Sequence, residues 1–272
     1  MKKYLLAMTS SALLLAWTVC TSVDAQIGYA RGQDVSPTFD GWELNSDGTY
    51  TLHFGYFNRN SEEALDVPIG PDNNFDPGGD RGQPTHFYPD RRWWVFKVVV
   101  PKDWPKDRRA VWTLTTHGKT NQAKGWLQPE WEVDKDLIWK NAGRDPSLMT
   151  AGVNETDLDH ENRPPSITGS PAQTINVSDT LTLTATATDD GRPKPVSDPR
   201  GRLQQGVRLR WVLYRGPGTV RIEPDIMSQR VYGTPATLET KIRFTVPGAY
   251  RLRAIASDGQ AFSTFDVDVT VK

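Results

Sequence analysis

The sequence has few of the residues used for cross-linking or covalent chemistry. Its 272 residues include a single cysteine, Cys20, which excludes a disulfide within the chain. The formal net charge is −1, which excludes a global attraction to nucleic acid or to an anionic membrane. No HExxH, GxSxG or phosphate-binding glycine-rich motif occurs. The enzyme classes that depend on those motifs are therefore not indicated.

The first 25 residues have the pattern of an export signal. A basic start at residues 2 and 3 precedes an apolar run over 5–19 that is too short for a membrane anchor. Val23, Asp24 and Ala25 provide small residues at −3 and −1 of a cleavage site. We therefore expect export to the periplasm or the cell exterior, with a mature chain beginning at Gln26 and free of cysteine. The alternative is a lipoprotein acylated at Cys20, although the residue before it fits that pattern poorly.

Turn-forming residues and alternating apolar runs are abundant. The chain has 22 glycines, 20 prolines and 10 tryptophans, a mixture typical of short strands joined by turns. Residues 50–56 alternate apolar and polar side chains, and the run at 93–100 places Trp94, Phe96, Val98 and Val100 on one face. An Asp-Gly pair at 47–48 predicts a hairpin. We interpret residues 26–36 as a polar arm and 37–127 as an N-terminal β-sandwich.

The period of two is clearest in the last hundred residues. Runs at 181–188, 208–213, 242–246, 250–256 and 265–271 each present one apolar face. They predict a second sandwich over 164–272, with Trp211 in its core. Residues 128–163, which are acidic and contain Trp131 and Trp139, are expected to connect the two. The predicted fold is all-β, with two immunoglobulin-like β-sandwich domains in tandem after a signal peptide.

The strings LTLTATATDDG, VRLRWVLYRGPGTV and FTVPGAYRLRAIASDG carry a family resemblance. Residues 162–272 resemble a polycystic-kidney-disease (PKD) type or related immunoglobulin-like module of bacterial secreted proteins. Trp211 stands at the place of the core tryptophan, and Tyr250 resembles the tyrosine corner. The loop at 192–206 is longer than the family pattern. The resemblance implies a spacer or adhesion module without catalysis. The N-terminal domain resembles an uncharacterised secreted bacterial module, which implies no function.

The loop at 70–87 is a first candidate calcium site. Asp72, Asn74, Asp76 and Asp80 fall at positions 1, 3, 5 and 9 of a calcium-loop count. Position 6 is a proline and position 12 a glutamine, so the match is partial. Asx turns and Pro-Gly turns are the alternative explanation for these residues.

The junction between the domains is a second candidate calcium site. In an immunoglobulin-like sandwich, the loops after the second and sixth strands lie at the same end as the domain entry, so acids from all three can converge there. Carboxylates so placed are suitable calcium ligands. The alternative is simple Asp-Gly turn chemistry. The candidate residues are Asp189, Asp190, Asp258, Asp157, Asp159 and Glu161.

Aromatic and basic side chains form a candidate ligand surface. Several tryptophans are hard to bury together, and arginines on the third and sixth strands of the second sandwich point away from its core. Such groups can stack on sugar rings and hold an anionic polysaccharide. The alternatives are packing of the tryptophans against the connector and cross-strand ion pairs with Asp266 and Asp268. The candidate residues are Trp93, Trp104, Trp126, Trp131, Arg208, Arg210, Arg251 and Arg253.

The sequence therefore favours a secreted or periplasmic, non-enzymatic binding or structural module. A carbohydrate or a surface protein is the expected partner, calcium is the candidate cofactor, and no nucleic-acid partner is expected. No transmembrane segment is expected after signal cleavage. The alternative is a polysaccharide-acting hydrolase with acids from the 70–87 loop. Two carboxylates about 5–9 Å apart across a groove would favour the hydrolase, whereas acids spread into solvent would favour the binding module.

Overall fold

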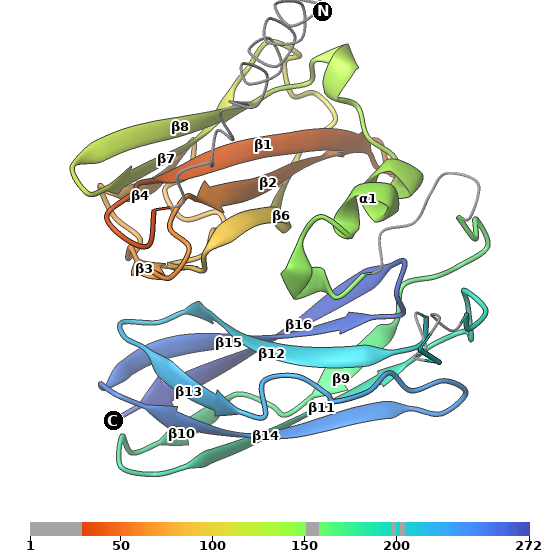
Figure 1. Cartoon of the computed structure of the whole chain (residues 1–272). Helices are drawn as coiled ribbons and strands as arrows, with labels where there is room; N and C mark the ends of the chain where they lie inside the picture. Colours follow the sequence, from red (N-terminus) through yellow and green to blue (C-terminus); the bar gives the residue numbers. More distant parts are fainter. Residues whose placement is uncertain (1–28, 151–157, 197–199, 202–204) are drawn as a thin grey trace, which may run out of the picture.

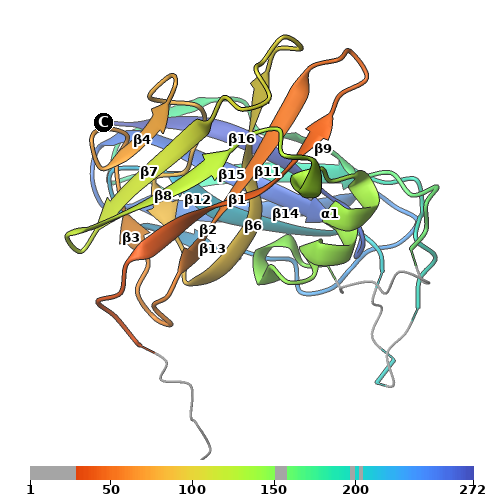
Figure 2. The same cartoon turned by 90° about the horizontal axis from the view of Figure 1, so that it is seen from above.

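The computed structural model describes residues 29–150, 158–196, 200–201 and 205–272. Two β-sandwiches lie one above the other (Figure 1), which confirms the all-β prediction of tandem sandwich domains. Seen from above, the first sandwich covers much of the second, and its strands cross those of the second obliquely (Figure 2). Among the described residues, no helix is long and apolar enough to cross a membrane.

The first domain packs two three-stranded antiparallel sheets, with a short two-stranded ribbon beside them. Phe54, Phe75, Phe96 and Trp112 fill the space between the sheets with aromatic contacts. The sheet orders are β1-β2-β6 and β4-β7-β8, and the ribbon is β3-β5. The bounds are β1 (Val35–Leu44), β2 (Tyr50–Asn58), β3 (Leu65–Asp66), β4 (Asn73–Asp76), β5 (His86–Phe87), β6 (Asp90–Val100), β7 (Ala110–Thr116) and β8 (Lys119–Gly125).

One prediction about β6 is wrong. Phe96, Val98 and Val100 enter the core as expected, but Trp94 packs in a separate apolar cluster outside it. The pairing of β2 with β6 is interrupted here, because Phe54 pairs with Phe96 while Tyr56 pairs with Arg92. The backbone of Trp94 also has a φ of 56°. The regular alternation that underlay the prediction therefore stops before Trp94.

The second domain packs two four-stranded sheets, in the orders β10-β16-β15-β12 and β13-β14-β11-β9. Trp211 is 1% exposed, which confirms its predicted place in the core. The hydroxyl of Tyr250 donates to Val246 O at 2.8 Å, as a tyrosine corner does. The bounds are β9 (Ser166–Gly169), β10 (Gln173–Ile175), β11 (Leu181–Thr188), β12 (Arg208–Arg215), β13 (Val220–Glu223), β14 (Ala236–Phe244), β15 (Gly248–Ser257) and β16 (Phe262–Val271).

The segment between the sandwiches contains the helix α1 (Lys135–Ala142) and two 3₁₀ turns, η1 (Pro129–Trp131) and η2 (Pro146–Leu148). Asp134 caps α1 by accepting a hydrogen bond from Leu137 N at 2.8 Å. Trp139, on α1, is buried, whereas Trp131 is 44% exposed and lies against Phe39 of the first domain. The packing of Trp131 on Phe39 agrees with the interpretation that the connector packs back on the first domain.

Replacing Trp211 with alanine should destabilise the second domain by roughly 3–5 kcal/mol, because it opens a cavity at the centre of a packed core. Trp131→Ala, which removes an exposed indole, should cost much less. Denaturant unfolding followed by circular dichroism measures both. A change for Trp211→Ala no larger than that for Trp131→Ala would contradict the packing of this core.

Candidate functional site between the two domains

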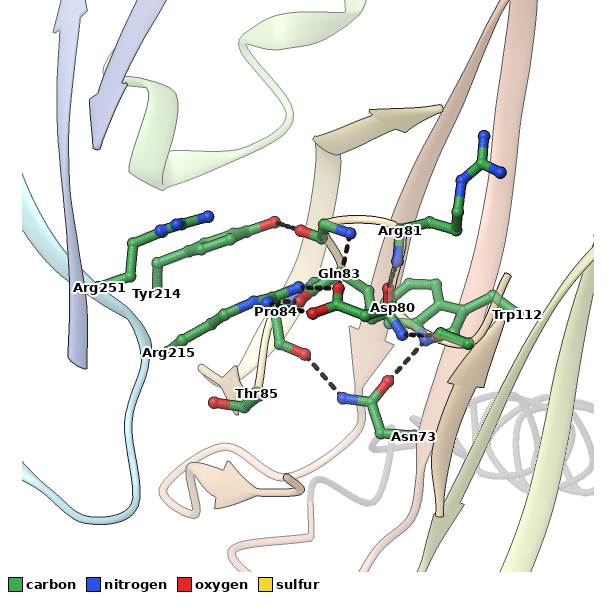
Figure 3. Close-up of polar contacts among 12 residues, drawn as sticks. Asn73, Asp80, Arg81, Gln83, Pro84, Thr85, Trp112, Tyr214, Arg215 and Arg251 are labelled. Carbon is green, nitrogen blue, oxygen red and sulfur yellow. Dashed lines mark hydrogen bonds and ion pairs between the residues drawn. The ribbon is translucent and has the colours of Figure 1, made fainter. Parts of the chain in front are cut away.

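Two buried amide side chains give the loop from Gly70 to Phe87 its shape. Asn73 donates to Val67 O at 3.0 Å and to Pro84 O at 2.8 Å, and its Oδ1 accepts from the indole of Trp112 (Figure 3). Gln83 donates to Gly79 O at 2.8 Å and accepts from Arg81 N at 2.8 Å. Both amides are fully buried. Buried polar atoms need hydrogen-bond partners, and these bonds supply them.

The end of this loop is hydrogen-bonded to strand β12 of the second domain. The guanidinium of Arg215 binds both carboxylate oxygens of Asp80, at 2.9 and 2.7 Å, and donates from Nε to Gln83 O at 2.8 Å. The hydroxyl of Tyr214 donates to Gly82 O (Figure 3). We call this set of contacts the clamp. Its members are Asp80, Gly82, Gln83, Thr85, Tyr214, Arg215 and Gly216.

Strand β12 needs this cover because it is the edge of its sheet. Thr85 N donates to Tyr214 O at 3.2 Å, and Gly216 N donates to Thr85 Oγ1 at 3.1 Å. Leu213 N donates to the hydroxyl of Tyr88 at 2.9 Å. The first domain therefore supplies hydrogen-bond partners for backbone N–H and C=O groups at the open edge of β12.

An apolar cluster fills the interface beside the clamp. It combines residues of both sandwiches with residues of the connector, so it belongs to neither domain core. On the second domain it uses Val212 and Ile255, which point away from that domain's own core. The buried members are Trp94, Val133, Ala142, Leu148, Met149 and Ile255. The outward face of the β12–β15 sheet is therefore an interdomain surface at this position, not a solvated one.

A pocket of about 440 Å³ lies between the domains next to this cluster. Asp145, 1% exposed, organises one wall from the start of η2. It accepts from Arg92 Nη1 at 3.1 Å, from Trp93 N at 2.9 Å and from Ser147 N at 2.8 Å. The next residue, Pro146, accepts from Arg210 Nη1 at 3.4 Å. The η2 turn thereby gathers polar side chains from both domains around the pocket.

Two phenols of the wall stay neutral. Burial raises the pKa of Tyr88 to about 12 and raises that of Tyr56 as well. The Tyr56 hydroxyl accepts from the backbone N–H of Tyr88 at 3.0 Å, and the Tyr88 hydroxyl accepts from Leu213 N at 2.9 Å. Both phenols therefore act as neutral hydrogen-bonding groups at physiological pH.

The candidate ligand residues divide between this pocket and other surfaces. Trp93, Arg210 and Arg253 line it. Arg253 is fully engaged, since it pairs with Asp266, donates to Val95 O at 2.7 Å and lies over the ring of Tyr214. The other candidates contact groups elsewhere: Trp104 with Arg108, Trp126 with Arg109, Trp131 with Phe39, Arg208 with Met227 and Arg251 with Asp268. Both predicted cross-strand ion pairs, with Asp266 and Asp268, are present.

Three pocket residues had no signal in the sequence. Arg92, Trp94 and Asp145 come from the interrupted part of β6 and from η2. A regular strand pattern assigns Trp94 to the core, and a lone Asp-Pro pair marks only a turn. Their role depends on the contact between the domains, which no local pattern encodes.

The candidate residues of the 70–87 loop lie outside the pocket. Asp72, Asn74 and Asp76 are exposed, Asp80 is held by Arg215, and none of the four lines the pocket. The hydrogen bonds from Arg215 lower the pKa of Asp80. This distribution favours the binding module over the hydrolase.

Arg192, from the long loop of the second domain, pairs with the linker acids at the domain junction. It binds Asp159 at 2.8 Å and also contacts Glu161. Asp190 accepts from Arg192 N at 3.0 Å, and Asp189 accepts from Gly191 N at 3.0 Å, both as turn contacts. Asp157 lies outside the described residues.

Asp258 is fully buried at the same junction. It accepts from Gln260 N and Ala261 N, each at 2.7 Å, and from Asn162 Nδ2 at 3.0 Å. Within the part of the chain that the structure describes, no group of three or more His, Cys, Asp or Glu side chains is placed to hold a metal ion. Calcium at the junction, or at the 70–87 loop, stays a prediction.

No family model matches this sequence, and no curated protein is significantly similar to it. Among solved structures, the D00-D0 domain of intimin is 10% identical, with 88% of this chain and 100% of that chain covered, at a TM-score of 0.26. A PKD domain of a human protein is 16% identical, with 42% and 88% covered, at 0.22. A CARDB domain from Pyrococcus furiosus is 15% identical, with 42% and 100% covered, at 0.25. A PKD domain is thus among the matches, in agreement with the sequence resemblance, but scores this low carry no argument about function.

The clamp should contribute measurable coupling between the domains. In a double-mutant cycle, Asp80→Ala and Arg215→Ala should show an interaction energy of about 1 kcal/mol, because the pair is bidentate. Arg251→Ala with Asp268→Ala, a bidentate pair within the second domain, is the matched control. Urea unfolding gives each value. The clamp as described would be contradicted if Arg215→Ala cost no more than Arg251→Ala, since only Arg215 also binds a carbonyl of the other domain.

Asp258 should make stability fall as pH rises. Burial raises its pKa from 3.8 to about 7, so between these values the folded chain binds a proton that the unfolded chain has lost. The contribution is present below about pH 4 and disappears as pH rises through about 7. Asp258→Asn should flatten this part of the pH profile of melting temperature, while Asp103→Asn, on an exposed turn, should leave it unchanged. An unchanged slope in Asp258→Asn would contradict a protonated Asp258.

Proposed function

We propose that the protein is an exported, non-enzymatic binding module that holds a carbohydrate in the pocket between its two domains. One observation carries the proposal. Trp93, Arg210 and Arg253, which lie far apart in the sequence and were candidates for a carbohydrate surface, line the same pocket. Its volume of about 440 Å³ falls in the range of small-molecule sites.

The chemistry of the walls supports a sugar. Tyr88, Trp93, Trp94 and Tyr214 supply aromatic surface from both domains. Aromatic rings pack against the apolar face of a sugar, while a few fixed polar groups bind its hydroxyls. Asp145 fixes the positions of Arg92 and Trp93 through hydrogen bonds. The pocket thus has the apolar walls and the oriented polar groups that sugar binding requires.

The acids of the pocket support binding rather than hydrolysis. A glycosidase of the common kind needs two carboxyl groups across the scissile bond. Asp145 and Asp225 both line the pocket. Asp145 is occupied by donors from Arg92, Trp93 and Ser147, and Asp225 lies 3.8 Å from Arg210 Nε. His86 also lines the pocket and contacts Asp66 at 2.6 Å. Among the described residues, no serine or threonine hydroxyl is hydrogen-bonded to His86, so no activated nucleophile is formed there.

A glycan array probed with the mature protein tests the proposal. The wild type should bind a defined set of saccharides, and Trp93→Ala should lose that binding by removing an aromatic wall. Trp104→Ala is the matched control, because Trp104 belongs to the same domain but contacts Arg108 on another surface. Melting temperatures confirm that both variants fold. Absence of any bound saccharide would refute the function, and binding that Trp93→Ala leaves intact would refute the location.

A further inference from the structure

We infer that the ligand of the interdomain pocket is an acidic sugar, and that Arg92, Trp94 and Arg210 bind its charged group. This inference rests on the proposed function and adds the chemical class of the ligand. Its basis is the placement of two guanidinium groups from different domains on Asp145 and Pro146, the two consecutive residues at the start of η2. Arg92 contacts Asp145 at 3.1 Å, and Arg210 contacts Pro146 O at 3.4 Å. The start of η2 therefore holds one cation from each domain at the wall of the pocket.

Unpaired polar atoms in the wall of the pocket are all hydrogen-bond donors. Among the described residues, the buried atoms without a partner in this wall are Nε of Arg92, Nε1 of Trp94 and Nε of Arg210. Neither an indole N–H nor a guanidinium can accept a hydrogen bond. A buried donor without a partner costs free energy. A ligand that supplies acceptor oxygens would remove this cost, whereas a cation would not.

Trp94 is held in position for this role. Its side chain is 9% exposed, so its indole N–H is shielded from bulk water. Its backbone has a φ of 56°, and its N–H donates to the buried carboxylate of Asp40 at 2.9 Å. The ring also meets that of His53 edge to face, with centroids 5.6 Å apart. Contacts on several sides therefore fix the direction of the donor.

The positive charge of Arg210 is only loosely balanced. Its nearest carboxylate oxygen, on Asp225, is 3.8 Å from Nε, beyond hydrogen-bond range, and the Asp225 side chain is 55% exposed. Burial, and after it the charge of Arg210, lowers the pKa of the neighbouring Arg208. In contrast, Arg253 has its guanidinium bound to Asp266 and Val95 O. Arg210 is therefore the cation best able to take a new anion.

The form of the pocket favours a charged sugar over a bare inorganic anion. A carboxylate or sulfate offers two or three acceptor oxygens to the unpaired donors. Such an ion alone would leave uncovered the aromatic surface that Tyr88 and Trp93 contribute to the pocket. A pyranose ring attached to the anion would cover it. The carboxylated and sulfated sugars share this chemistry, and the experiment separates them.

Calorimetric titration of the full mature chain with four probes tests the inference: digalacturonic acid, a sulfated galactose disaccharide, neutral digalactose and inorganic sulfate. An acidic disaccharide should bind at least about tenfold more tightly than the neutral one, a difference of about 1.4 kcal/mol, because hydrogen bonds to a charged group are stronger than those to a neutral one. This preference should weaken as salt is raised. The two acidic probes identify which anion the pocket prefers.

Arg210→Gln should reduce the preference for the acidic disaccharide to near unity while retaining binding of the neutral one. Arg208→Gln is the matched control, because the Nε of Arg208 already donates to Met227 O at 2.7 Å and the residue lies outside the pocket lining. Equal affinity for acidic and neutral disaccharides would overturn the inference and leave the proposed function standing. Binding of inorganic sulfate as tight as that of the acidic disaccharide would also overturn the inference. If no saccharide binds, the proposed function fails, and the inference falls with it.

Discussion

The open edge of strand β12 is the constraint on which the arrangement of the two domains depends. Exposed N–H and C=O groups along a sheet edge pair with whatever chain is available, so a protein must cover them or block them. Here the first domain covers them with Thr85 and Tyr88, and the ion pair between Asp80 and Arg215 fixes the approach. The 70–87 loop is long because it must reach this edge, and Asn73 and Gln83 stiffen it for that purpose.

The pocket follows from the same contact. The clamp contacts and the contacts of η2 join the two domains. Residues of both domains then line the space that remains, including Arg92 from β6 and Arg210 from β12. Neither domain alone can build this site. The proposed binding function would therefore require both sandwiches.

Local patterns in the sequence predict the strands well but not the interface. The alternation around Trp211 places that residue in the core, and Tyr250 forms the expected corner. The same alternation fails at Trp94, because the strand pairing is interrupted there. The alternation also predicts which arginines point away from the core of the second domain. It does not predict that the first domain covers part of that outward face. Arg192 was missed as the partner of the junction acids, because it lies in the loop that departs from the family pattern.

Hydrogen exchange of individual backbone amides tests most directly whether the first domain completes the edge of β12. The account predicts slow exchange for Thr85, Leu213 and Gly216, whose N–H groups each bond to the other domain. In Arg215→Ala these three amides should exchange faster, while Trp211 N, which donates to Asp225 O within the second domain, should keep its protection. Exchange of the three amides at the rate of exposed amides in the wild type would contradict the account.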